Sequence, residues 1–185
     1  MKPVRGMERI RITGGELRGR VIKSPKSDLT HPMGAREKLA LFNMIGRFLP
    51  SAKVLDAYAG SGALGIEALS RGAARVIFIE KSPKVVKIIH ENLRLLGAED
   101  KSSVYCCNVL SFDTEMKFDV ILADPPYDNF VLSEIEHLSR FLQKGGILAL
   151  SHTGMPPALP GLELVKSRNY ARATISIYTN GSTTQ

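Results

Sequence analysis

The sequence predicts an α/β fold with a mainly parallel sheet, and two observations carry that prediction. After Pro50, short apolar runs bounded by turn residues alternate with stretches of helical spacing, which is typical of a parallel sheet covered by helices on both faces. The chain has 185 residues, 44% of them hydrophobic and 23% charged, and can form one domain with a substantial core. No apolar run approaches the ~20 residues needed to cross a membrane, and residues 1–6 lack the apolar stretch of a signal peptide.

Seven strands and three helices are expected after residue 50. The expected strands cover residues 54–56, 76–80, 103–107, 118–123, 147–150, 162–166 and 174–178, the last two as a hairpin. The expected helices cover residues 63–69, 82–96 and 131–142. Ser82-Pro83 marks the start of the second helix, because Ser is favoured at the N-cap and Pro at the first helical position, and Gly97 ends it.

The chain before residue 50 is expected to form a hairpin, a loop and a helix. Residues 8–13 and 16–22 flank Gly14-Gly15, which predicts a tight turn between two strands. Prolines indicate a loop over residues 23–32, and apolar residues at helical spacing predict a helix over residues 36–48. Three regions are expected: a basic extension with a small β-hairpin over residues 1–33, a main domain over residues 34–180, and a disordered tail over residues 181–185.

The positive charge of the chain is concentrated in its N-terminal part. Residues 1–53 hold twelve Lys/Arg against four Asp/Glu, whereas residues 54–185 hold thirteen against fourteen. A concentrated positive charge favours contact with a polyanion, and nucleic acid is the expected one. Taken singly, each of these side chains also fits a solvated surface charge. The expected phosphate-binding set is Arg9, Arg11, Arg18, Arg20, Lys23 and Lys26.

The cysteines and histidines indicate neither a disulfide framework nor a metal site. Cys106 and Cys107 are the only cysteines, and their adjacency suits a reducing cytoplasm. They end an apolar run and are expected to be ordinary buried strand residues rather than reactive thiols. The four histidines show no metal-ligand spacing, so no metal is expected.

Ala123-Asp124-Pro125-Pro126-Tyr127 ends the apolar run of residues 118–122. The prolines stop that strand and stiffen the chain just beyond it, because each fixes its own φ and restricts the residue before it. Asp124 and Tyr127 are therefore expected at the carboxyl end of a strand, where open α/β sheets bind their ligands. A fixed acceptor beside a flat ring suits an amine on a planar base. A rigid loop with a helix-capping Asp is the structural alternative.

Gly60-Ser61-Gly62-Ala63-Leu64-Gly65 matches the G-x-G-x-x-G pattern of nucleotide-binding loops. Glu80 follows about 20 residues later, at the spacing of an acid that binds ribose hydroxyls. An NAD-dependent dehydrogenase is therefore one alternative. Asp56 argues against it, since a carboxylate at the end of the first strand repels a pyrophosphate but can hold the ammonium group of a methionine moiety. The loop thus favours S-adenosyl-L-methionine as the ligand.

The stretch Val54–Ala73, together with Ala123–Tyr127, resembles the RsmD family. The resemblance extends over nearly the whole chain, including residues 12–20, residues 32–43 and the terminal hairpin. Members of this family are bacterial methyltransferases that modify the exocyclic N2 of one guanine in small-subunit (16S) ribosomal RNA. The resemblance implies a Rossmann-like, S-adenosylmethionine-dependent methyltransferase fold.

The resemblance also implies direct transfer of the sulfonium methyl to guanine N2, with S-adenosyl-L-homocysteine as the product. Asp124 and the Pro125 carbonyl are expected to accept both amine hydrogens, while Tyr127 stacks on a base that has left its own stack. A cytoplasmic monomer acting on RNA within a 30S particle, away from membranes, is expected. The implied catalytic residues are Asp124, Pro125, Pro126 and Tyr127. The implied cofactor-binding residues are Asp56, Ala57, Gly60, Ser61, Gly62, Glu80, Lys81, Asn108, Val109 and Asp124.

Two positions depart from the family pattern. Asn108 stands where Asp is usual, and because an Asn oxygen still accepts from the adenine amine, the contact is weakened rather than abolished. Lys38-Leu39 stands where the family has Arg-Glu. Two roles therefore stay open for the helix over residues 36–48: it binds the ligand, or it only packs against the domain. The Asp124 motif by itself fits any exocyclic amine. An adenine-N6 methyltransferase acting on DNA or RNA therefore stays open, as does a non-catalytic RNA-binding module.

Overall fold

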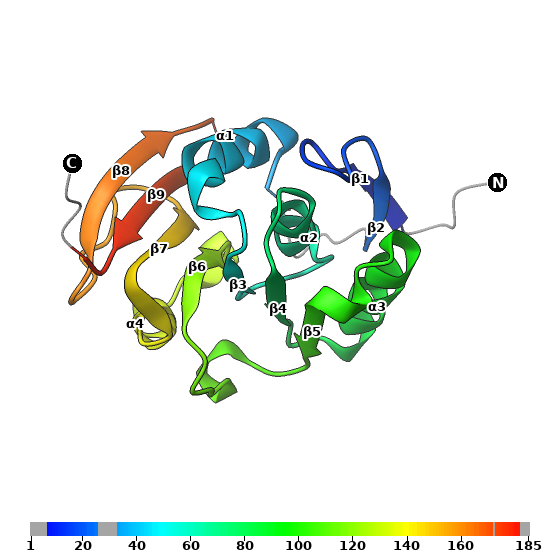
Figure 1. The fold of residues 1–185 in the computed structure, drawn as a ribbon. Coiled ribbons are helices and arrows are strands. Elements are labelled where there is room, and N and C mark those ends of the chain that lie inside the picture. The colour runs from blue at the N-terminus through cyan, green and yellow to red at the C-terminus, as the bar shows by residue number, and fades with distance from the viewer. Residues whose placement is uncertain (1–6, 26–32, 172, 182–185) are drawn as a thin grey trace.

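The fold is built around one seven-stranded sheet (Figure 1). The structure is a computed structural model that describes residues 7–25, 33–171 and 173–181. The strands are β3 (Lys53–Asp56), β4 (Arg75–Ile79), β5 (Ser102–Tyr105), β6 (Phe118–Ala123), β7 (Leu142–His152), β8 (Glu163–Asn169) and β9 (Thr174–Thr179), in the order β5-β4-β3-β6-β7-β9-β8. The first five strands in that order are parallel, and β9 runs antiparallel to both of its neighbours. The predicted α/β class, with a mainly parallel sheet and a C-terminal antiparallel hairpin, is confirmed.

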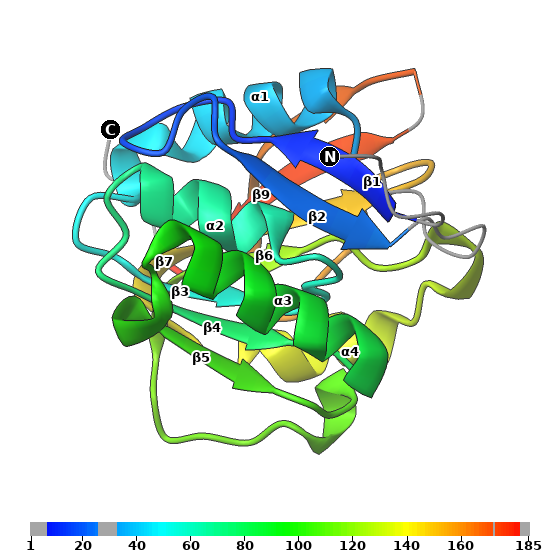
Figure 2. The ribbon, with the colours of Figure 1, turned by 90° about the vertical axis from the view of Figure 1, so that its right-hand side faces the viewer.

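Helices cover both faces of this sheet (Figure 2). Successive residues of β3 point to opposite faces, so Val54 packs in the cluster that contains Ile66 and Ile89, while Leu55 packs in the cluster that contains Ile135. Burial on both faces explains why the strands appear as continuous apolar runs. The α-helices are α1 (Ala35–Ile45), α2 (Ala63–Ser70), α3 (Pro83–Leu96) and α4 (Leu132–Ser139), and the short 3-10 helices are η1 (Gly46–Phe48), η2 (Glu99–Lys101), η3 (Val109–Ser111) and η4 (Tyr127–Asn129).

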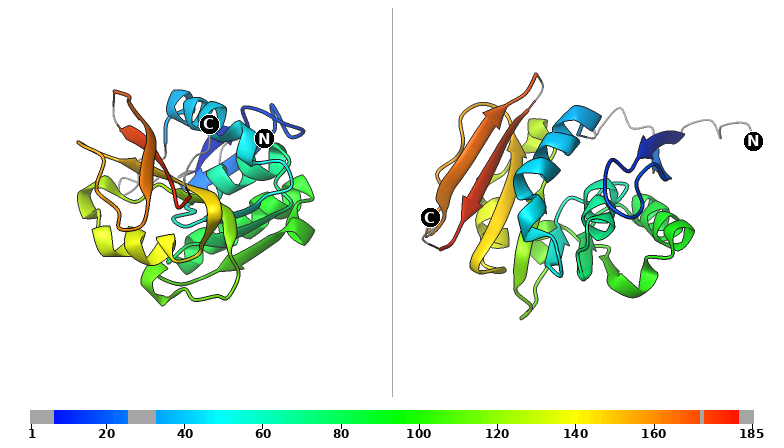
Figure 3. Two further views of the ribbon diagram at one scale, coloured as in Figure 1. Left: turned by 60° about the vertical axis from the view of Figure 1, so that its left-hand side comes forward. Right: turned by 45° about the horizontal axis from the view of Figure 1, so that its top comes forward.

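The N-terminal hairpin pairs β1 (Met7–Arg11) with β2 (Val21–Pro25) and lies at the opposite end of the molecule from β8 and β9 (Figure 3). The tight turn predicted at Gly14-Gly15 is wrong, because residues 12–20 form a longer folded loop between the two strands. Gly15 instead allows a close approach to α2, since a Cβ at this position would lie 1.7 Å from the Ser70 carbonyl oxygen. Ile12 and Ile22 are fully buried in the core cluster that also contains residues of α2 and α3. The hairpin is therefore packed into the core.

Other predicted boundaries are displaced by a few residues. β2 continues to Pro25, inside the predicted loop, and β5 ends at Tyr105, which leaves Cys106 exposed and Cys107 half-buried outside the strand. The prediction of buried strand cysteines is wrong because the chain turns toward η3 at this point. The predicted helix end at residue 142 is also wrong, since Leu142 pairs with Phe118 and begins β7.

Some expectations concern parts of the chain that are not described. Lys26 and residues 182–185 of the expected tail lie outside the described residues. Within the described ranges, no helix combines the length and the apolar character required to cross a membrane.

Candidate active site

Three carboxylates converge where the parallel strands end. Asp56 is the last residue of β3, Glu80 directly follows β4, and Asp124 directly follows β6. The chain leaves β3 toward β4 and β5 on one side and returns as β6 on the other. This reversal of strand order is the switch point at which open α/β sheets bind ligands, and Asp124 and Glu80 lie close enough to Asp56 to influence its charge.

Asp56 is buried and unusually basic for a carboxylate. Its side chain is 1% exposed, and its Oδ2 accepts a hydrogen bond from the Gly65 N–H at 2.8 Å, in the first turn of α2. Burial, together with the negative charges of Asp124 and Glu80, raises the pKa of Asp56 to about 7, although the hydrogen bond from Gly65 lowers it. Asp56 is therefore surrounded by negative charge, and among the described residues neither it nor Glu80 nor Asp124 forms an ion pair.

The glycine loop between β3 and α2 is held in place by Glu80. Glu80 accepts hydrogen bonds from the Gly60 N–H at 3.0 Å and from the Ser82 N–H at 2.8 Å, one on each carboxylate oxygen. Each oxygen keeps a second acceptor position, which suits ribose hydroxyls. Gly62 has a φ of 81° directly before α2, a conformation that favours glycine. The Ala57 N–H bonds to the Leu122 carbonyl at 2.9 Å and ties the start of the loop to β6.

Asn108 caps a short helix on the far side of the site. Asn108 is exposed, and its Oδ1 accepts a hydrogen bond from the Leu110 N–H at 3.0 Å, at the start of η3. The side-chain carbonyl oxygen of Asn108 has a second lone pair, so it can accept one hydrogen bond from the Leu110 N–H and another from an adenine amine. Val109 next to it is buried, whereas the residue Lys81, just beyond β4, is exposed.

Asp124 and Tyr127 form the opposite wall of the site. Burial raises the pKa of Asp124, hydrogen bonds from Ser151, from Tyr127 and from the backbone of Met33 lower it, and the resulting pKa is about 6. The Tyr127 hydroxyl lies 3.4 Å from Asp124 Oδ1 and 2.7 Å from Ser151 Oγ. Burial, followed by the charge of Asp124, raises the pKa of Tyr127 to about 12. Pro125, between them, is buried. The ring and the carboxylate are thus held together by a shared set of hydrogen bonds.

Sequence reasoning missed Ser151 and Met33. Leu150 pairs with Ala123, so Ser151 of β7 lies beside Asp124, the residue that directly follows β6. A polar residue at the end of an apolar run was the available signal, but its use requires knowing that β7 neighbours β6. Met33 precedes α1 and approaches Asp124 only through the tertiary fold, so no local pattern indicates it.

The predicted phosphate-binding residues divide into two groups. Arg11 donates to the Gly19 carbonyl at 3.1 Å, Arg20 donates to the Leu95 carbonyl at 3.0 Å, and Lys23 pairs with Glu91 at 2.7 Å. Arg9 and Arg18 are exposed, and within the described part of the chain they have neither an ion-pair nor a hydrogen-bond partner. Among the described members of the set, Lys23 has its charge paired, and Arg9 and Arg18 are the two whose side chains make no internal contact that a phosphate would have to replace.

Lys38, one of the two departures from the family pattern, lies in a buried network with the Arg11 carbonyl and Glu67. Its side chain is almost fully buried, its Nζ donates to the Arg11 carbonyl at 2.9 Å, and it lies 3.4 Å from Glu67 Oε2. This lysine joins α1 to the hairpin and to α2. These contacts favour a packing role for Lys38 itself, whereas the charge of the adjacent Glu37 reaches Tyr127 at the candidate site and contributes to its raised pKa.

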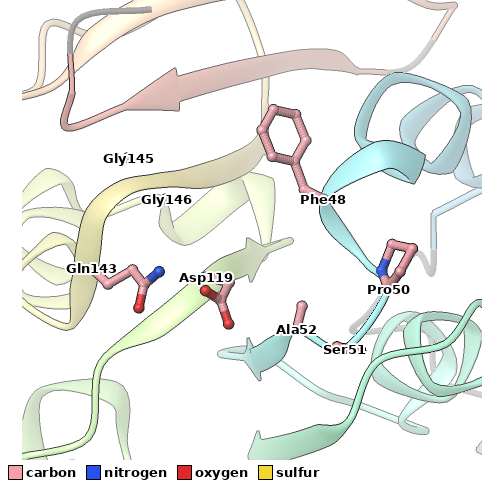
Figure 4. Close-up of a pocket in the computed structure, with 8 residues that line it drawn as sticks. All are labelled: Phe48, Pro50, Ser51, Ala52, Asp119, Gln143, Gly145 and Gly146. Carbon is pink, nitrogen blue, oxygen red and sulfur yellow. The ribbon is translucent and has the colours of Figure 1, made fainter.

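Two cavities lie away from these residues. The smaller, of about 170 Å³, is at the amino ends of β3 and β6, where Asp119 accepts a hydrogen bond from the Lys53 N–H at 2.7 Å (Figure 4). It is on the edge of the sheet opposite to Asp56 and Asp124. The larger, an open hollow of about 640 Å³, lies beyond the end of β7, between Thr153 and Tyr170. Neither cavity is lined by a predicted catalytic or cofactor-binding residue.

Comparisons with known proteins agree with this arrangement. Ribosomal RNA small subunit methyltransferase D of Escherichia coli (strain K12) is 37% identical over 146 residues, which cover 78% of this chain and 72% of that protein. The solved structure of the Escherichia coli protein yhhF matches with a TM-score of 0.83 at 30% identity, over 93% of this chain and 98% of that one. Magnesium protoporphyrin IX methyltransferase from Synechocystis PCC 6803, solved with bound SAM, shares the fold at 15% identity and a TM-score of 0.61, over 77% and 78% of the two chains.

The family profile also matches nearly the whole chain. The family described as "Conserved hypothetical protein 95" matches residues 10–179, from the first strand of the hairpin to the end of the last strand of the sheet. The chain therefore belongs to this family, which is the RsmD family that its sequence resembles.

Proposed function

We propose that this protein is an S-adenosylmethionine-dependent methyltransferase that methylates the exocyclic N2 of a guanine in small-subunit ribosomal RNA. The observation that carries the proposal is the convergence of Asp56, Glu80 and Asp124 at the switch point of the sheet. Their mutual repulsion favours a positively charged ligand. The sulfonium and ammonium groups of S-adenosylmethionine supply that charge, whereas the pyrophosphate of a dinucleotide adds to the repulsion.

The residues at the carboxyl edge fit this cofactor in three ways. Asp56 lies where a carboxylate can hold an ammonium group, and Glu80 keeps free acceptor positions for ribose hydroxyls beside the Gly60–Gly62 turn. Asn108 offers an amide oxygen to an adenine amine. The bound cofactor supplies an electrophilic methyl group. Ala57, Ser61, Lys81 and Val109 complete the proposed cofactor-binding set.

Asp124, Pro125, Pro126 and Tyr127 then act on the base. Asp124 and the Pro125 carbonyl accept the two hydrogens of the guanine amine, which concentrates electron density on a nitrogen that is otherwise conjugated with the ring. Tyr127 stacks on the base, and because its hydroxyl is held by Ser151 and Asp124, the ring orientation is set before the base arrives. An Asp124 pKa of about 6 lies near the working pH, which suits a group that accepts the proton lost by N2.

The proposed substrate is RNA within a small-subunit particle, bound by a monomer in the cytoplasm. The Escherichia coli relative named ribosomal RNA small subunit methyltransferase D supports this substrate class. The exposed Arg9 and Arg18 of the hairpin supply phosphate contacts, which anchor the RNA without reading its sequence. The target base leaves its stack to reach Asp124, as for other enzymes that act on nucleobases.

The test is transfer of a tritiated methyl group to undermodified small subunits, followed by nucleoside analysis of the product. We expect N2-methylguanosine in ribosomal RNA, and its loss in an Asp124→Asn variant. Labelled N6-methyladenosine would instead indicate the adenine enzyme. A wild-type protein that binds neither S-adenosylmethionine nor S-adenosylhomocysteine in calorimetry would overturn the proposal in favour of a non-catalytic RNA-binding module.

A further inference from the structure

The N-terminal hairpin is fastened to both helices that follow the proposed cofactor loops. α2 begins directly after the glycine loop, and α3 begins three residues after Glu80. We infer that the buried side chain of Asn92, on α3, is a positioning residue that ties the glycine loop to the hairpin, so that the hairpin braces the cofactor site. This inference rests on the proposed function, because it concerns the affinity for the proposed cofactor.

Asn92 joins three parts of the molecule through one amide group. Its side chain is fully buried, and its Nδ2 donates to the Ser61 carbonyl of the glycine loop at 3.0 Å and to the Lys23 carbonyl of β2 at 2.8 Å. Its Oδ1 accepts from the Lys23 N–H at 2.9 Å. Both amide hydrogens and the oxygen are therefore used, and Asn is the smallest side chain that offers two donors and an acceptor in this geometry.

A second fastening connects the hairpin loop to α2. Glu67 of α2 is fully buried and accepts from the Thr13 N–H at 2.9 Å, from Thr13 Oγ1 at 2.7 Å and from the Gly14 N–H at 2.8 Å. The Ser70 carbonyl accepts from the Glu16 N–H at 2.7 Å. Because α2 starts at the end of the glycine loop, this fastening fixes the helix that the loop leads into, while Asn92 fixes the loop itself.

The glycine loop depends on such support. Gly60 and Gly62 both have a positive φ, of 52° and 81°, and glycine has many other conformations available. Glu80 holds the loop through the Gly60 N–H, and Asn92 holds it through the Ser61 carbonyl on the side of the hairpin. Loss of the second support allows the loop to populate conformations that do not bind the cofactor. The apparent affinity then falls by the fraction of molecules that keep the binding conformation.

The experiment compares two neighbouring substitutions in the full-length protein. Asn92→Ala removes the link to Ser61, whereas Glu91→Gln breaks only the exposed pair with Lys23. Calorimetry with S-adenosylhomocysteine is expected to show at least about tenfold weaker binding for Asn92→Ala and no change for Glu91→Gln. Ile45→Val, at the end of α1, is a control for destabilisation alone, since it lowers the melting temperature without taking part in these hydrogen bonds.

The outcomes separate this inference from the proposed function. Wild-type protein that binds S-adenosylhomocysteine together with an Asn92→Ala variant that binds it equally well would overturn the inference and leave the function intact. Hydrogen exchange of the wild-type protein gives an answer that does not depend on any variant folding. Binding of S-adenosylhomocysteine is expected to slow exchange of the Lys23 amide, which Asn92 connects to the loop, and unchanged exchange at this amide would also contradict the inference.

Discussion

A buried carboxylate lies at each of two places in this molecule, Glu67 in one and Asp56 in the other, and their pKa values are shifted in opposite directions. Where the hairpin loop meets α1 and α2, Glu67 lies beside Lys38 and Arg71 at 3.4 and 3.0 Å; we call this cluster of Thr13, Lys38, Glu67 and Arg71 the hairpin junction. Burial pushes its pKa up, but the hydrogen bonds from Thr13 and the two cations pull the pKa of Glu67 below its usual value. At the carboxyl edge, by contrast, the pKa values of Asp56 and Asp124 are raised to about 7 and about 6.

This difference in the direction of the pKa shifts indicates which of the two places is suited to bind a charged ligand. The charge of a buried carboxylate that is surrounded by cations and N–H donors is compensated within the protein. Glu67 is such a group, and it contributes to a defined packing of the hairpin on α1 and α2. Asp56, which is buried, and Asp124, which is half-buried, have raised pKa values and no cation within ion-pair distance among the described residues, and such groups are enriched at functional sites. The comparison predicts that changes at the carboxyl edge mainly alter chemistry, and that changes at the hairpin junction mainly lower stability.

The largest expected effect is the loss of methyl transfer in Asp124→Asn. The variant keeps the shape of the side chain but replaces an acceptor with a group that also donates, so the rate of transfer is expected to fall by roughly 10² to 10³ fold. Single-turnover assays with a tritiated methyl donor measure this fall. Asp119→Asn, which changes the other carboxylate of β6 at its amino end, is the matched control. Comparable losses in both variants would remove Asp124 from the mechanism.

Glu67→Gln tests the hairpin junction. The substitution leaves Lys38 buried without its charge partner, and a broken buried pair destabilises a protein by about 3–5 kcal/mol. Urea unfolding measures the free energy, with Glu99→Gln in the exposed pair with Arg94 as the control, for which a change of at most ~1 kcal/mol is expected. A loss below ~1 kcal/mol for Glu67→Gln would mean that the junction is not the stabilising cluster.

The pH dependence of the methyl-transfer rate tests whether Asp124 is the group that accepts the amine hydrogens. The carboxylate accepts the amine hydrogens only when ionised, so the rate is expected to fall as the pH drops below about 6, by about tenfold per pH unit. Because a hydrogen bond from Ser151 lowers the pKa of Asp124, Ser151→Ala moves this acidic limb to higher pH. Rate profiles of the two proteins at saturating cofactor check both statements. Superimposable limbs would show that another group controls the profile.

The pH dependence of stability tests Asp56 in the same way. Its pKa is raised to about 7 in the folded protein and has an ordinary value of about 4 in the unfolded chain, so the folded state binds its proton more tightly. The stability that this group contributes is therefore present in full below about pH 4 and is lost as the pH rises through about 7. Asp56→Asn is expected to flatten that part of the profile of unfolding free energy against pH. An unchanged profile would contradict the raised pKa.

The sequence revealed the carboxyl edge better than the hairpin junction, for a physical reason. Asp56, Glu80 and Asp124 each follow an apolar run, and parallel strands bring such ends to one edge without further information. Ser151 and Asn92 depend on which elements are neighbours in space, a non-local property that no periodicity encodes. Gly14-Gly15 was misassigned for the same reason, because a pair of glycines fits both a tight turn and a close approach to α2.

The smallest expected effects concern the surface charges of the hairpin. Deletion of the hairpin is a poor test of RNA binding, because Ile12 and Ile22 belong to the core and Glu67 would lose its donors. Arg9→Ala and Arg18→Ala remove exposed charges without these losses. Each substitution is expected to weaken RNA binding a few-fold and to reduce the slope of log affinity against log salt by about 1.

Arg11 is the internal control for this prediction. Its guanidinium already donates to the Gly19 carbonyl, so Arg11→Ala removes a positive charge from the same strand as Arg9 but from a side chain that is committed within the protein. Filter-binding titrations over a range of salt concentrations compare the slopes of the three variants. A change in slope for Arg11→Ala as large as that for Arg9→Ala would show that an internal hydrogen bond does not keep a charge from the phosphates, and would contradict this ranking of the side chains.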